Sequence, residues 1–162
     1  MLLSSRRSFV LTFAALAGCG FRPAYAPGGP AEGLRGRVSV QPPKDVNDFT
    51  LLKRLEERLG RPQASRYILN YQLDLSESGL AISPTQEITR FHIVGKARFS
   101  LTDTANGQVV KSGLVDSFTS YSATGTTIST QVAKQDAYRR LMVILADQIV
   151  THLLSPDTGD GQ

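Results

Sequence analysis

Two stretches of the chain place apolar residues at the spacing of a helix. Between residues 47 and 59, leucines recur every three or four positions among charged side chains, which predicts an amphipathic helix. Asn47 or Asp48 can cap its start, and Gly60 can end it. A longer helix is predicted over residues 126–154. Its expected buried stripe consists of Ala133, Ala137, Tyr138, Leu141, Met142, Ile144, Leu145 and Ile149.

Shorter stretches follow the two-residue period of β-strands. Residues 38–40 are a short strand candidate, and residues 67–75 alternate apolar and mostly polar side chains as a half-buried strand does. A turn is expected after this second strand, at Ser78 and Gly79, because glycine and serine are common turn residues.

The third and fourth strands are expected to form a hairpin. Residues 88–101 divide into an apolar face and a polar face, and Asn106-Gly107 is typical of a tight hairpin turn. The returning strand, residues 108–121, divides less cleanly, so a β-bulge is expected in it. The order strand, helix, three strands, helix predicts an α+β fold, with two helices packed on one face of a small, mainly antiparallel four-stranded sheet.

The first 18 residues have the layout of a signal peptide. Arg6 and Arg7 precede the apolar run 9–16, which is far shorter than the roughly 20 residues that span a bilayer. Ala17-Gly18 then leads to the single cysteine of the chain, Cys19, in a pattern that resembles the lipobox of bacterial lipoproteins. We therefore expect a cleaved signal peptide over residues 1–18, a tether over 19–33 lipidated at Cys19, one domain over 34–154 and a disordered tail over 155–162. The general secretory and twin-arginine export routes both stay open.

The charge balance argues against a nucleic-acid partner. The formal net charge of the full chain is +4, from 18 basic and 14 acidic residues. Loss of Arg6 and Arg7 with the signal peptide would leave 16 basic residues and all 14 acidic ones. A nucleic-acid-binding domain normally carries a clear basic excess to neutralise phosphates.

The chemistry that an enzyme needs is sparse in this sequence. His92 is expected on a polar strand face and His152 near the end of the last helix, and neither has partners at metal-ligand spacing. The hydroxyl-rich stretch 117–130 lacks a paired base. We therefore expect no enzymatic activity, no metal and no cofactor.

A cationic strand face is the strongest candidate for a binding site. Arg90, Lys96 and Arg98 share the polar face of the third strand, and Lys111 is expected opposite them across the hairpin. Such side chains are either the solvated face of an antiparallel sheet or a site for phosphates or carboxylates, for example those of an anionic lipid headgroup.

Several segments together resemble the LptE family of lipopolysaccharide-assembly lipoproteins in its alphaproteobacterial form. They are Cys19-Gly20-Phe21-Arg22-Pro23, Phe91-x-Ile93-x-Gly95-x-Ala97 with Gly107, Thr119-Ser120-Tyr121-Ser122, and Ala133 with the stretch from Asp136 to Ile149. The resemblance implies a lipid-anchored protein on the periplasmic side of the outer membrane. Such a protein plugs the β-barrel LptD, helps it assemble and contacts lipopolysaccharide.

Two other functions stay open on the residues alone. One is an auxiliary lipoprotein of an ABC-type transporter for lipids or solvents, which would have a similar tethered α+β domain. The other is a lipoprotein hydrolase, which the missing catalytic constellation disfavours.

Overall fold

The computed structural model describes residues 33–82 and 88–155 of the chain. The predicted signal peptide, Cys19, all of the predicted tether except Gly33 and the predicted tail after Ser155 lie outside the described residues. The domain boundaries expected from the sequence therefore stay a prediction.

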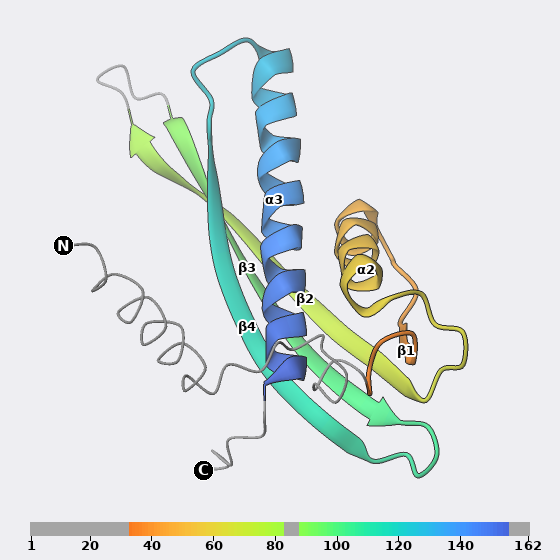
Figure 1. Ribbon diagram of the computed structural model, residues 1–162. Coiled ribbons are helices and arrows are strands. Elements are labelled where there is room, and N and C mark those ends of the chain that lie inside the picture. The colour runs from red at the N-terminus through yellow and green to blue at the C-terminus, as the bar shows by residue number, and fades with distance from the viewer. Residues whose placement is uncertain (1–32, 83–87, 156–162) are drawn as a thin grey trace, which may run out of the picture.

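The described residues form a four-stranded sheet with two helices on one of its faces (Figure 1). Along the chain the elements are β1 (Val38–Val40), α2 (Val46–Leu59), β2 (Tyr67–Ile82), β3 (Ile88–Asp103), β4 (Val109–Ser122) and α3 (Thr127–Leu154). The strands lie in the order β1-β2-β3-β4, with β1 parallel to β2 and the other neighbours antiparallel. The predicted α+β fold and its element order are confirmed.

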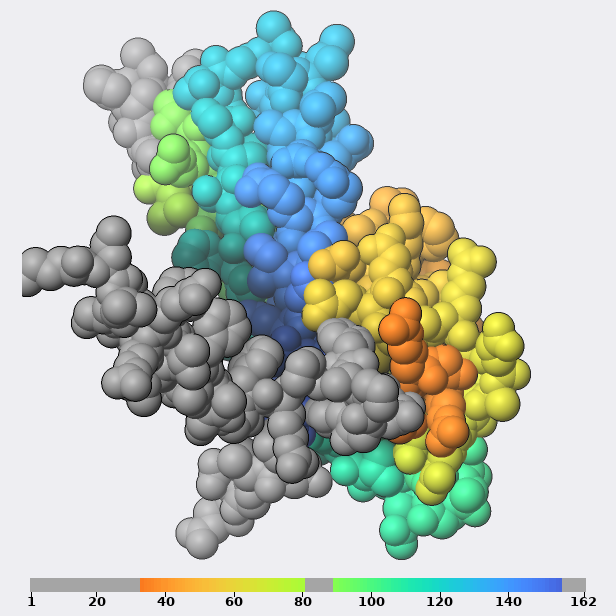
Figure 2. All heavy atoms as spheres, viewed as in Figure 1, coloured from red at the N-terminus to blue at the C-terminus, as the bar shows by residue number. Residues whose placement is uncertain are grey.

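The core lies between the helices and the sheet face that they cover. The buried sheet residues are Leu69, Tyr71, Ile93, Ala97, Phe99, Leu101, Val115 and Tyr121, and they follow the two-residue period. The helices contribute Leu51, Leu55 and Leu59 from α2 and Ala137, Leu141, Met142, Leu145, Ala146, Ile149, Val150 and Leu153 from α3. The space-filling view shows α2 and α3 in contact, side by side (Figure 2). Each fully buried leucine stabilises the fold by roughly 1.5–3 kcal/mol.

Two details of the helices differ from the sequence prediction. Ile144 is 37% exposed because it lies at the margin of the buried stripe that runs through Leu145. The N-cap of α2 is Asp45, whose Oδ1 accepts a hydrogen bond from the Asp48 N–H at 2.8 Å. The predicted caps, Asn47 and Asp48, were wrong, because an aspartate at the N-cap bonds the N–H three residues further on and only Asp45 has that position.

Glycines with positive φ angles mark two predicted chain reversals. Gly60 ends α2 with a φ of 79°, and Gly107 closes the β3–β4 hairpin with a φ of 70°. The Gly107 N–H donates to the Asp103 carbonyl at 2.9 Å. The expected bulge is also confirmed, since the register of β3 and β4 shifts next to Leu101.

The turn expected at Ser78 and Gly79 was wrong. Both residues lie within β2, where Ser78 pairs with His92 and Gly79 pairs with Phe91 of β3. The ladder with β3 satisfies the backbone of this segment and outweighs the local preference of serine and glycine for a turn.

Candidate functional site on the open sheet face

The sheet has a second face, opposite the helices, which we call the open face. Arg90, Lys96 and Arg98 of β3 are exposed on this face, while their neighbours in sequence Ala97 and Phe99 are buried under the helices. The strand alternation predicted for these three cations is therefore confirmed.

Lys111 does not lie on the open face. It pairs with Leu101 of β3, which faces the helices, and its Nζ donates a hydrogen bond to the Ser155 carbonyl at the end of α3. Its expected place opposite the three cations was wrong, because Lys111 has the same parity in β4 as the buried Val115. Any contact of Lys111 with a lipid would be made from the other side of the sheet.

The charge of Lys96 is flanked by two acidic residues. In the sheet register, Lys96 of β3 pairs with Asp74 of β2 on one side and with Asp116 of β4 on the other. Directly opposed cross-strand side chains lie about 5 Å apart at Cβ, so both carboxylates offset the ammonium group. Sequence reasoning missed this arrangement because Asp74 and Asp116 come from other strands.

Arg98 lies in an open hollow of the sheet surface. It pairs with Gln72 of β2 and Leu114 of β4. The hollow has a volume of about 540 Å³, and its lining includes Lys44, Asn70, Gln72, Arg98, Ser100 and Ser112. Lys44 and Arg98 are the charged residues of the described lining, which contains no acid. A guanidinium, an ammonium, amides and hydroxyls in one hollow suit a phosphate or a carboxylate with neighbouring sugar hydroxyls.

The three predicted cations do not form one cluster. Arg90 is eight residues from Arg98 along β3, which corresponds to roughly 27 Å of strand. It pairs with Ser122 near the opposite end of the sheet. The structure thus separates Arg90 from Arg98 and adds Lys44, which sequence reasoning missed because Lys44 lies in the connection between β1 and α2.

Both histidines pack on aromatic rings. The His92 ring lies on the open face with its centroid 4.8 Å from that of Phe118, and His152 meets Phe99 edge-on at 5.9 Å. Within residues 33–82 and 88–155, no group of three or more histidine, cysteine, aspartate or glutamate side chains could hold a metal ion.

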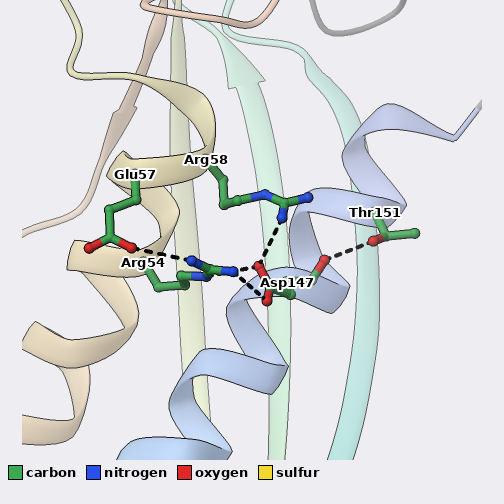
Figure 3. A network of polar contacts seen from close by, with 5 residues as sticks. All are labelled: Arg54, Glu57, Arg58, Asp147 and Thr151. Atoms are coloured by element: carbon green, nitrogen blue, oxygen red, sulfur yellow. Dashed lines mark hydrogen bonds and ion pairs between the residues drawn. The ribbon is translucent and has the colours of Figure 1, made fainter. Parts of the chain in front are cut away.

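Polar contacts fix the two helices to each other. The Arg54 guanidinium of α2 donates to both carboxylate oxygens of Asp147 in α3, from Nε to Oδ1 at 3.0 Å and from Nη2 to Oδ2 at 2.9 Å (Figure 3). Arg58 adds an ion pair to Asp147 at 3.7 Å, and Thr151 donates to the Asp147 carbonyl. The hydrogen bonds to Asp147 raise the pKa of Arg54 above its usual value.

A second polar cluster fixes α3 to the sheet. The carboxylate of Glu77 in β2 accepts hydrogen bonds from the hydroxyls of Tyr121 and Tyr138 and forms an ion pair with Lys134 at 2.8 Å. Burial acts to raise the pKa of Glu77, but these three donors outweigh it, and the pKa lies below the usual value. The cluster holds the helices over one face and leaves the open face free for binding.

The fold and the open face define a small α+β domain with a cationic surface hollow. The chain belongs to the LptE family of lipopolysaccharide-assembly proteins, whose model matches residues 36–153. The protein therefore has a role in lipopolysaccharide assembly, and its family is one of lipoproteins defined by assembly and not by a catalysed reaction. Among the helices of the described residues, none has the length and apolar character to cross a membrane.

Solved structures share the fold at low sequence identity. A protein from Caulobacter crescentus is 22% identical, with a TM-score of 0.63, over 78% of this chain and 94% of that chain. The rare lipoprotein B from Shewanella oneidensis is 13% identical, with a TM-score of 0.54, over 71% of this chain and 89% of that chain. Lipoprotein B from Nitrosomonas europaea is 14% identical, with a TM-score of 0.56, over 73% and 81%. A search of curated protein sequences finds no match.

Proposed function

We propose that this chain is an outer-membrane lipoprotein that plugs an LptD-like β-barrel, helps the barrel assemble and assists insertion of lipopolysaccharide at the cell surface. The family match over residues 36–153 supports this proposal. Lipidation of Cys19 after removal of residues 1–18 would hold the domain at the periplasmic side of the outer membrane. Two or three acyl chains give a durable anchor, whereas one chain anchors only marginally.

The hollow around Arg98 is the observation that supports lipopolysaccharide contact. Arg98 can bind a phosphate oxygen pair bidentately, and Lys44 adds a second positive charge to the same hollow. The amide of Gln72 and the hydroxyls of Ser100 and Ser112 can bind sugar hydroxyls. Lys96 is a weaker candidate because Asp74 and Asp116 flank it.

Substitution of Arg98 tests the lipid site. We expect Arg98→Gln to weaken the binding of fluorescently labelled lipopolysaccharide by the detergent-solubilised lipoprotein by roughly tenfold or more, since a hydrogen bond to a charged group contributes about 1.5–3 kcal/mol. Arg90→Gln is the matched control, because it removes the same charge about 27 Å away along the strand. We expect less than a threefold change for the control. Equal binding by the Arg98→Gln protein and the unchanged protein would remove the hollow from the proposal.

Native mass spectrometry of the complex extracted from membranes tests the partner and the anchor together. We expect a complex with one large β-barrel protein and, for this chain, a mass that corresponds to residues 19–162 with acyl chains on Cys19. A co-purifying ATPase of an exporter would instead support the transporter-associated function. An unmodified Cys19 would contradict the lipid anchor whichever partner is found.

A further inference from the structure

The outer edge of β4 is a long unpaired strand edge. β4 is the last strand in the sheet order, and it is 14 residues long. Among the described residues, no strand lies beyond it. An unpaired edge of this length presents a row of N–H and C=O groups that can pair with another strand.

Two hydrogen bonds identify which residues face that edge. The Ala123 N–H donates to the Thr89 carbonyl of β3 at 2.9 Å, so residue 123 and the odd-numbered residues of β4 direct their backbone groups toward β3. The even-numbered residues 112–120 then direct theirs outward. Consistent with this, the Ser120 carbonyl accepts a hydrogen bond from Arg140 of α3 at 3.3 Å. Arg140 thus closes the edge at Ser120 and leaves residues 112–118 open.

The open part of the edge has apolar side chains beside it. Leu114 and Phe118 are 53% and 66% exposed, and Ile144 of α3 is 37% exposed. A hollow of about 320 Å³ lies between β4 and α3, where the buried Oε1 of Gln148 has no hydrogen-bond partner in the described part of the chain. An apolar edge with an unsatisfied acceptor beside it indicates a surface that a further strand covers.

We propose that β4 pairs antiparallel with β4 of a second copy of this chain, about a two-fold axis at Leu114. In this register Leu114 faces Leu114 of the second copy, and Ser112 faces Asp116, so similar side chains meet and no like charges are opposed. A register with its axis at Asp116 would oppose two aspartates. The axis at Leu114 also keeps the pairing within the stretch that Arg140 leaves open. The inference is independent of the proposed function, because it concerns the strand edge and not the Arg98 hollow.

Thiol cross-linking of the full chain tests the register. A short bifunctional thiol reagent should cross-link the Leu114→Cys protein to itself at least tenfold faster than the Asn70→Cys protein, which carries its thiol on the open face but on β2. Ser112→Cys and Asp116→Cys proteins should cross-link when mixed, and each alone should react no faster than the Asn70→Cys protein. The unchanged chain measures any background from Cys19. Equal rates for Leu114→Cys and Asn70→Cys, or self-linking of Ser112→Cys as fast as the mixture, would overturn the proposal.

Sedimentation of the detergent-solubilised protein gives a second measurement that needs no new cysteine. The unchanged chain and the Asp116→Asn protein should sediment as dimers. Asp116→Pro should be a monomer, because proline removes an outward N–H that the dimer uses and β3 does not. The thermal midpoint of the Asp116→Pro protein shows whether the domain stays folded. A monomeric unchanged chain at every concentration tested would overturn the proposal, and so would a folded Asp116→Pro protein that stays dimeric.

Discussion

The two faces of the sheet in this protein are stabilised in different ways. The helix-covered face has buried apolar residues from three strands, and polar contacts at its margins fix the helices in place. The open face pairs Lys96 with two aspartates and places Arg98 in a hollow with neutral polar neighbours. One face therefore carries most of the folding free energy, and the other can change its chemistry at little cost in stability. A binding surface on such a domain can vary without loss of the fold.

The largest expected difference between the faces is in apolar truncation. Leu145 has no exposed surface, so Leu145→Ala should lower the free energy of unfolding by about 2–5 kcal/mol. Ile68 lies on the open face and is 40% exposed, so Ile68→Ala should cost less than about 1.5 kcal/mol. Urea unfolding followed by circular dichroism measures both. Equal losses would mean that the open face is covered in solution.

The polar contacts between the helices should have a smaller effect. Asp147→Ala removes both bonds to Arg54 and the ion pair to Arg58, and we expect a loss of about 1 kcal/mol because these side chains are about one third exposed. Asp74→Ala is the matched change on the open face, where an exposed acid faces Lys96. It should change the free energy of unfolding by less than about 0.5 kcal/mol. A larger loss for Asp74→Ala than for Asp147→Ala would reverse the assignment of stability to the covered face.

Local periodicity was enough to predict the elements of this fold. The leucines of α2 and the alternation of β2 and β3 are short-range patterns, and the tight turn at Asn106-Gly107 is equally local. The turn predicted at Ser78 failed because a long-range ladder outweighed a local preference. Where the prediction depended on residues within one segment, it was confirmed, and where a distant strand decided the outcome, it was not.

The candidate site depended on strand register and was predicted only in part. Arg98 could be placed on the open face from the alternation of β3 alone. The neutral surroundings of Arg98, the acids beside Lys96 and the approach of Lys44 follow from which strands are neighbours. The position of Lys111 could have been found by counting residues back from Val115, since parity alone places both on one face.

The smallest expected effect is a dependence of stability on pH that only the covered face shows. The Glu77 carboxylate is charged and bonded to Lys134, Tyr121 and Tyr138 in the folded state, and its pKa is lowered relative to the unfolded chain. A lowered folded-state pKa means that the unfolded chain binds the proton more readily. The contribution of Glu77 to stability is therefore present above the usual glutamate pKa of about 4.3, and it is lost as the pH falls through the folded-state value.

Urea unfolding at neutral pH and at about pH 3 checks this sign, with that pH chosen below the ordinary glutamate value. The unchanged chain should lose more stability on acidification than the Glu77→Gln protein, because the amide cannot take up the proton. Asp74→Asn is the control on the open face, where it should leave the pH dependence close to that of the unchanged chain. If Glu77→Gln and the unchanged chain lose the same free energy of unfolding between the two pH values, the cluster around Glu77 does not stabilise the charged carboxylate. The attachment of α3 to the sheet would then rest on apolar packing alone.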